Sequence, residues 1–125
     1  MRPLCPVTVV GPNGSRAIDA LVDTGADVSC FPRTLAVELG IDLTRGSACP
    51  IVFGSSTSHG IRTTADLIFA GQRRRPDVVW VGDMVYPHPV LGRSGVFSIF
   101  GEVAFIERER TPRVEFRWMT KGGLT

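Results

Sequence analysis

Short apolar runs, separated by glycine, proline and small polar residues, dominate the chain. Near the start, a short apolar segment at 7–10 and a segment at 16–22 that ends in the apolar run Ala20-Leu21-Val22 flank Gly11-Pro12-Asn13-Gly14. Glycine and asparagine accept positive φ, and proline fixes φ near about −65°, so this segment is a strong turn signal. The pattern therefore predicts a β-hairpin at the amino end of the chain.

One segment instead has helical spacing. Pro32 suits the first position of a helix, because the N–H that proline lacks would be unpaired there. Leu35 and Leu39 are four residues apart and share one face, and Gly40 fits the left-handed residue that ends many helices. We predict a short helix that begins at Pro32 and ends before Gly40.

The middle of the chain returns to strand-like patterns. Residues 50–54 and 61–70 are apolar-rich and flank the small polar segment from Ser55 to Gly60. This arrangement predicts a long hairpin, within about residues 50–70, whose loop is mobile. The basic segment from Gln72 to Pro76 is interpreted as a solvated turn.

The rest of the chain adds further short elements. Strands are predicted at 78–81, 84–86, 103–106 and 114–118, and a short second helix at 94–100. With so few helical segments, the fold class expected is all-β.

Composition limits the broad class of protein. The 125 residues, 43% of them hydrophobic, suffice for a single domain that spans 1–125. No apolar stretch is long enough to span a membrane, and the first ten residues do not resemble a signal peptide. A net charge of +2 is too small to indicate a nucleic-acid partner. Cys5, Cys30 and Cys49 are odd in number and lack CxxC spacing, which favours reduced thiols and a cytoplasmic location.

The segment with the clearest chemical meaning follows the second predicted strand. There the apolar run Ala20-Leu21-Val22 leads directly into Asp23, Thr24 and Gly25. A carboxylate at the end of a buried strand is costly unless it is hydrogen-bonded, paired or protonated. The tripeptide by itself is more often an ordinary Asx turn, so the residues around it decide whether it is a catalytic motif.

A second apolar segment that ends in glycine lies downstream. Val90 and Leu91 lead into Gly92 and then Arg93. Asp27, just after the first motif, and Arg93, just after the second, carry opposite charges and could meet as a semi-buried ion pair.

The two motifs in this order resemble those of the retropepsins, the single-domain aspartic proteases of retroviruses and their cellular and bacterial relatives. The resemblance covers residues 2 to about 100 and includes the opening Arg2-Pro3-Leu4. It implies a closed β-barrel or sandwich, the acid protease fold, with a flap hairpin over the substrate. It also implies a homodimeric aspartic endopeptidase that needs no metal or cofactor.

The resemblance assigns roles to residues of both motifs. Asp23 matches the catalytic aspartate, one per chain, so that two chains together supply the dyad that activates a water molecule. Thr24 matches the threonine that bonds across the dimer, and Gly25 and Ala26 complete the active-site loop. Asp27 and Arg93 match the structural ion pair, while Leu91 and Gly92 form the second motif, in which the glycine packs beneath the loop.

The flap is the part that departs most from the viral pattern. Its residues are Ser55, Ser56, Thr57, Ser58, His59 and Gly60, in place of a glycine-rich tip. The chain also extends beyond the viral length, over about residues 101–125, and this extension could change the dimer interface. The start at Met1 without a leader favours a free-standing cellular or bacterial member of the family.

Other kinds of site are less well supported. His59 and His88 fit no common zinc spacing with the cysteines, and the serines before His59 lack a nucleophile elbow. The run Arg73-Arg74-Arg75 could contact phosphates, but no interleaved aromatic residues accompany it. The expected partners are therefore a second copy and a peptide or protein substrate. The alternative function is a retropepsin-fold module that binds peptides or dimerises with little or no proteolysis.

Overall fold

The computed structural model describes residues 3–53, 55–82, 88–94, 96, 102–106, 113–117, 119–120 and 123–124. Within these ranges strands dominate, and the one helix is short, α1 (Arg33–Glu38). The predicted all-β class is therefore confirmed. No helix of the described residues is long and apolar enough to cross a membrane.

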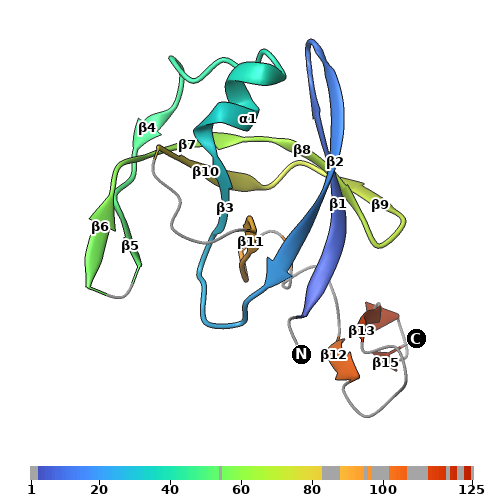
Figure 1. Cartoon of the computed structure of the whole chain (residues 1–125). Helices are drawn as coiled ribbons and strands as arrows, with labels where there is room; N and C mark the ends of the chain where they lie inside the picture. Colours follow the sequence, from blue (N-terminus) through green and yellow to red (C-terminus); the bar gives the residue numbers. More distant parts are fainter. Residues whose placement is uncertain are drawn as a thin grey trace.

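Nine strands form one sheet with the order β4-β7-β10-β3-β11-β2-β1-β8-β9, and Figure 1 shows β4 and β9, the two ends of this order, on opposite sides of the molecule. The two ends of this order, β4 and β9, are not paired, so the described strands do not close the predicted barrel. In sheet order the bounds are β4 (Ser47–Ala48), β7 (Gly60–Thr64), β10 (Asp77–Val81), β3 (Ser29–Pro32), β11 (Val90–Leu91), β2 (Gly14–Val22), β1 (Leu4–Gly11), β8 (Asp66–Phe69) and β9 (Gln72–Arg74).

The predicted hairpin at the amino end is confirmed. β1 and β2 pair in antiparallel register from Leu4↔Leu21 to Gly11↔Gly14, which leaves Pro12 and Asn13 as the two-residue turn. The turn contacts the end of the helix, because the backbone N–H of Asn13 donates to the carbonyl of Leu39 at 3.0 Å.

The predicted helix is also present, with one correction at its start. Pro32 is extended (φ −66°, ψ 137°) and precedes the first helical residue, Arg33. Proline at φ near −65° fits both an extended residue and a helical one, and here Pro32 also belongs to β3. At the other end Gly40 adopts φ +70°, the left-handed conformation that the sequence predicts there.

Three strand predictions were incomplete or wrong. β3 was not predicted, since its four residues show no alternation that could identify them. The predicted strand at 61–70 is two strands, β7 and β8, separated by Ala65. The predicted turn at 72–76 instead begins with strand β9. The turn lies at Ala70 and Gly71, whose φ values are 50° and 72°.

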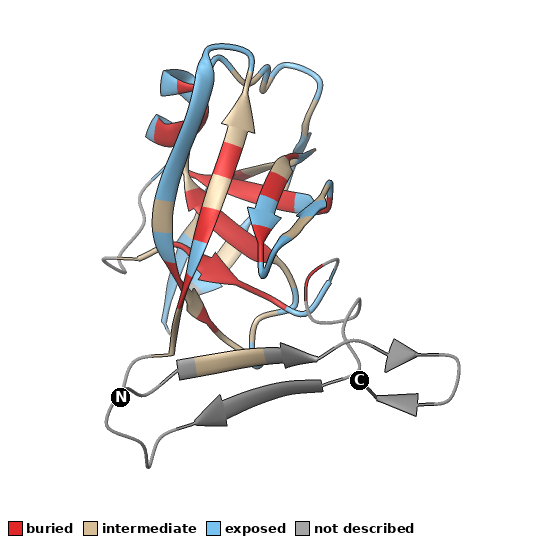
Figure 2. Ribbon diagram, turned by 90° about the vertical axis from the view of Figure 1, so that its right-hand side faces the viewer, coloured by how far each residue is buried: buried red, intermediate tan, exposed pale blue. Residues whose placement is uncertain are grey.

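Strand β10 is buried on both faces, and it separates two apolar clusters. Val78 and Trp80 point into the larger cluster, where Trp80 packs on Phe31 with ring centroids 5.7 Å apart. Val79 and Val81 point into a smaller cluster on the opposite face. Successive residues of a strand point to opposite faces, so one strand serves both clusters. Figure 2 shows this burial as red bands along the central strands.

The carboxyl end contributes a further hairpin. β12 (Glu102–Ile106) and β13 (Arg113–Arg117) pair in antiparallel register, which confirms both predicted strands there. Val114 packs against the larger cluster and so connects this hairpin to the core. β14 (Met119–Thr120) and β15 (Gly123–Leu124) form a two-stranded pair. The strand predicted at 84–86 lies outside the described residues, as does most of the helix predicted at 94–100.

Two adjacent residues of β8 test the burial pattern. Leu67 is fully buried, whereas Ile68 is 37% exposed. We expect Leu67→Ala to lower the free energy of unfolding by about 2–5 kcal/mol, since it removes core contacts and leaves a cavity. Ile68→Ala on the same strand should cost less than about 1 kcal/mol. Urea denaturation of both variants checks this, and equal losses would contradict the inward orientation of Leu67.

Candidate active site

The Asp-Thr-Gly segment starts where β2 ends, beside β11. β2 and β11 run parallel, with Leu21 opposite Val90 and Val22 opposite Leu91. The backbone N–H of Asp23 then donates to the carbonyl of Leu91 at 3.0 Å, and so continues the ladder by one bond. The two sequence motifs, almost 70 residues apart, are therefore adjacent strands of one sheet.

The turn at Asp23 has the hydrogen bonds of an Asx turn. Its carboxylate Oδ1 accepts the backbone N–H of Gly25 at 2.9 Å, and its carbonyl accepts the N–H of Ala26 at 3.2 Å. Within the described chain, no residue donates a hydrogen bond to Oδ2 of Asp23. The loop fixes one carboxylate oxygen and leaves the other available to water, a substrate or a second carboxylate.

The loop rests on the backbone of the second motif at Gly92. A β-carbon added to Gly92 would lie 2.4 Å from the carbonyl oxygen of Val28 and 2.9 Å from that of Ala26. The N–H of Gly92 donates to the side-chain hydroxyl of Ser29 at 3.0 Å, and Ser29 is fully buried. Only glycine allows the two backbones to approach this closely.

The sequence predicts an ion pair between Asp27 and Arg93. In the structure, backbone hydrogen bonds hold the segments of these two residues side by side. The N–H of Arg93 donates to the carbonyl of Ala26, and that of Ser94 to the carbonyl of Asp27, each at 2.9 Å. Both charged side chains are exposed, and no ion pair between Asp27 and Arg93 occurs among the described residues. The predicted semi-buried pair is therefore not formed in the single chain, where water solvates both charges and pairing gains little.

A cavity of about 460 Å³ opens beside this loop. The charged side chains in its lining are Asp23, Asp27 and Arg62. The other lining residues are small, apolar or thiol-bearing: Gly25, Ala26, Val28, Cys30, Cys49, Pro50, Ile51, Val52 and Val90. The cavity thus combines one available aspartate oxygen with a mostly apolar wall, as a site for a peptide side chain requires.

The hairpin predicted as a flap forms one side of the cavity. β5 (Ile51–Phe53) and β6 (Ser56–Ser58) pair from Ile51↔Ser58 to Phe53↔Ser56. Three residues that the sequence assigned to the loop are therefore strand residues, and His59 follows them. Figure 1 shows this hairpin projecting away from the sheet. Ile51 and Val52 line the cavity, whereas the predicted substrate-binding segment at 55–60 does not.

Comparison with known proteins agrees with this geometry. Residues 5–94 match the family described as aspartyl protease. The chain belongs to the aspartyl protease family. Among solved structures it is similar to EIAV protease in complex with the inhibitor HBY-793. The two share 21% identity and a TM-score of 0.58 over 74% of this chain and 83% of that one. No curated protein sequence matches the chain.

The predicted resemblance to the retropepsins is thereby confirmed, and with it the fold of an aspartyl protease. The family match begins within β1 and ends at Ser94, so it includes both motifs and the flap hairpin. The strands of the carboxyl end lie beyond it. The roles of the individual residues remain predictions, which the contacts above support in different degrees.

Two residues of the site could not be found from the sequence. Ser29 reads as an ordinary polar residue, and only its burial and its bond to Gly92 reveal its role. Arg62 lies within a predicted strand, and nothing in its neighbours indicates the cavity. Both depend on the strand order, which brings β3, β7 and β11 to one region of the sheet.

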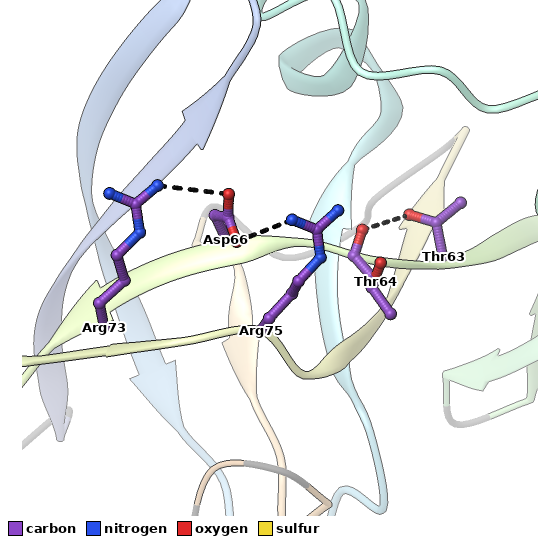
Figure 3. A network of polar contacts seen from close by, with 5 residues as sticks. All are labelled: Thr63, Thr64, Asp66, Arg73 and Arg75. Carbon is purple, nitrogen blue, oxygen red and sulfur yellow. Dashed lines mark hydrogen bonds and ion pairs between the residues drawn. The ribbon is translucent and has the colours of Figure 1, made fainter.

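A larger hollow of about 800 Å³ lies elsewhere on the protein and contains none of the motif residues. In its wall Asp66 accepts hydrogen bonds from Arg73 and Arg75, each at 3.3 Å (Figure 3). Two of the three consecutive arginines therefore bind a carboxylate on β8. The aspartate motif, and not the size of the hollow, identifies the smaller cavity as the candidate active site.

Gly92→Ala tests the backbone contact beneath the loop. We expect a loss of about 1–3 kcal/mol in the free energy of unfolding, because the nearest atoms are backbone and cannot move aside alone. Gly82→Ala is the matched control, since an added β-carbon there meets nothing closer than 3.9 Å. Urea denaturation measures both, and an equally small loss at the two positions would show that the contact is not a constraint.

The thiols of the chain should differ in reactivity. Burial, with a smaller contribution from nearby Cys49, raises the pKa of Cys30 to about 11. Burial, and then the charge of Asp19, raises the pKa of Cys5 to about 11. At pH 8 only about one in a thousand of these two thiols is ionised, whereas Cys49 is partly exposed in the cavity wall.

We therefore expect N-ethylmaleimide to label Cys49 at least about tenfold faster than the buried pair at pH 8. Because the raised pKa values lie near 11, labelling of Cys5 and Cys30 should still increase between pH 8 and 10. Peptide mass spectrometry gives the rates, and the urea-unfolded chain is the control in which all three should react alike. Equal rates in the folded chain would contradict the described burial.

Proposed function

We propose that the protein is an aspartic endopeptidase that acts as a homodimer, with one Asp23 from each chain. The observation that carries this proposal is the hydrogen-bond pattern at Asp23, which holds one carboxylate oxygen and leaves the other without a donor among the residues that the structure describes. Thr24 and Gly25 beside it are exposed, so a second chain can approach the loop along a twofold axis.

Two such carboxylates give the chemistry of peptide hydrolysis. At a separation of a few ångströms they cannot both remain ionised, so they share one proton. The ionised carboxylate takes a proton from water, which attacks the scissile carbonyl carbon, while the protonated one donates to the carbonyl oxygen. The proton then passes to the leaving amine as the C–N bond breaks. Oδ1 of Asp23, fixed by Gly25, would keep the carboxylates in position during these steps.

The apolar wall of the cavity supports a peptide as the substrate. Ile51 and Val52 of the flap hairpin face the same space as Val90 and Ala26. Val52 is 68% exposed. A substrate chain between the sheet and the hairpin would cover it and would exclude water from the reacting bond.

The same wall also suits the alternative function, a module that binds peptides without cleaving them. Because one chain alone forms the cavity, binding does not require the dyad. The two functions differ in what they demand of Asp23. Binding needs the cavity, whereas hydrolysis needs an ionisable carboxylate in each of two chains.

Asp23→Asn separates the two functions. An amide cannot accept the proton of the attacking water, so we expect peptide cleavage to fall by at least about 10³-fold, with folding unchanged. The measurement is digestion of a complex peptide mixture by both proteins over about pH 3.5–7.5, read by mass spectrometry.

Asp19→Asn, on the exposed part of β2, is the matched control and should retain activity. Analytical ultracentrifugation establishes that the tested samples are dimeric. Identical cleavage by wild type and Asp23→Asn would exclude the aspartic mechanism, and absence of cleavage by a dimeric wild type would favour the peptide-binding module.

A further inference from the structure

Arg62 is the one basic side chain in the lining of the active-site cavity, as far as the described residues show. Its place is set by the strand register. Arg62 on β7 pairs with Val79 on β10, which pairs with Cys30 on β3, which pairs with Val90 on β11. Side chains in register across a sheet point to the same face. Val79, Cys30 and Val90 belong to one apolar cluster, of which Cys30 and Val90 line the cavity.

This row gives the distance of Arg62 from the catalytic centre. Three strand spacings separate Arg62 from Val90, which is about 14 Å at about 4.8 Å per spacing. Val90 pairs with Leu21, two residues before Asp23 on the same face. A fourth spacing separates Val90 from Leu21, so the row measures about 19 Å. An extended peptide advances about 3.4 Å per residue, so this corresponds to about six residues, and the twist of the sheet and the long arginine side chain shorten it. Arg62 would therefore meet a substrate residue two to four positions from the scissile bond.

The guanidinium of Arg62 has donors to offer such a residue. Its Nε lies 3.4 Å from the carboxylate Oδ2 of Asp77, its diagonal neighbour on β10. The two side chains are 38% and 50% exposed, and ion pairs of this kind are weak. Within the described chain no hydrogen bond occupies the terminal nitrogens of Arg62. A planar guanidinium with free terminal N–H groups matches a carboxylate through two parallel hydrogen bonds.

The charges that line the cavity favour an acidic substrate residue at the position that faces Arg62. Asp23 and Asp27 repel a substrate carboxylate near the scissile bond, but their effect falls off with distance and screening. At Arg62 the substrate meets a cation whose ion-pair partner among the described residues, Asp77, is half exposed to solvent. Apart from Asp23 and Asp27, the other described lining residues are small, apolar or thiol-bearing and supply no cationic side chain.

We infer that Arg62 is a specificity-determining residue, which selects a carboxylate of the substrate two to four residues from the scissile bond. The inference rests on the proposed function, because it assigns the scissile bond to Asp23. In a homodimer each chain supplies an Arg62, so the preference appears on both sides of the bond. The carboxylate can belong to an Asp or Glu side chain or to the carboxyl terminus of a peptide.

The first arm of the test is a cleavage profile. A peptide mixture from a whole proteome is digested with wild type, Arg62→Gln and Arg45→Gln, and cleaved sequences are read by mass spectrometry. Arg45 is an exposed arginine outside the cavity and is the matched control. We expect Asp and Glu to be enriched about fivefold at one position two to four residues from the cleaved bond with wild type and Arg45→Gln. Arg62→Gln should lose this enrichment.

Asp77→Asn distinguishes recognition from a structural role. If Arg62 only joined β7 to β10 through Asp77, then Arg62→Gln and Asp77→Asn would have the same effect on the profile. If Arg62 recognises a substrate carboxylate, Asp77→Asn frees its charge and strengthens the acidic preference, opposite to Arg62→Gln. Equal profiles for wild type and Arg62→Gln would overturn the inference.

The second arm does not depend on catalysis. Asp23→Asn, with and without Arg62→Gln, is titrated against fluorescein-labelled random decapeptide pools that differ only in one central Glu or Gln. A further pair of pools differs only in a terminal acid or amide, which distinguishes side-chain from terminal carboxylates. We expect about fivefold tighter binding of an acidic pool, lost with Arg62→Gln.

These arms separate the two proposals. If wild type cleaves nothing, the proposed function fails, and the binding arm alone decides the role of Arg62. Equal affinity for acidic and neutral pools, or binding of neither, would then overturn the inference.

Discussion

The close contact between two backbone segments at Gly92 is the constraint on which the candidate site depends. Gly92 lies against the carbonyl groups of Ala26 and Val28, and its N–H is bound by the buried hydroxyl of Ser29. Neighbouring bonds from Arg93 and Ser94 join the same segments. Because backbone atoms cannot change rotamer, this contact fixes the loop after Asp23 more rigidly than side-chain packing could. The carboxylate is thus placed by backbone contacts and one serine hydroxyl, not by charged side chains.

The scaffold works because β3, β10 and β11 are covered on both faces. Phe31, Trp80 and Leu91 belong to the larger core, whereas Cys30, Val79 and Val90 form the smaller cluster, of which Cys30 and Val90 line the cavity. The same short strands thus stabilise the fold and shape the site. Burial on both faces also explains the inert character expected of Cys30, whose pKa is raised because its thiolate would be desolvated.

The proposed function needs two chains for a physical reason. A single carboxylate can accept a proton but cannot at the same time donate one, so hydrolysis needs a second acid. The exposed Thr24 and Gly25 and the exposed Val52 leave the site open toward a partner chain and toward a substrate. Membership of the aspartyl protease family agrees with this arrangement, and the hairpin of β12 and β13 lies beyond the residues that match the family.

Local chemistry was enough to determine much of this protein from the sequence. The turn at Pro12 and Asn13, the left-handed Gly40 and the Asp-Thr-Gly turn follow from the conformations that these residues prefer, and the two motifs identified the family. Only the tertiary structure decided which strands are neighbours. The four-residue β3, the burial of Ser29, the solvated separation of Asp27 and Arg93, and the presence of Arg62 in the cavity all follow from that order. Strand pairing joins residues that are far apart in the chain, and no local preference encodes which pairs form.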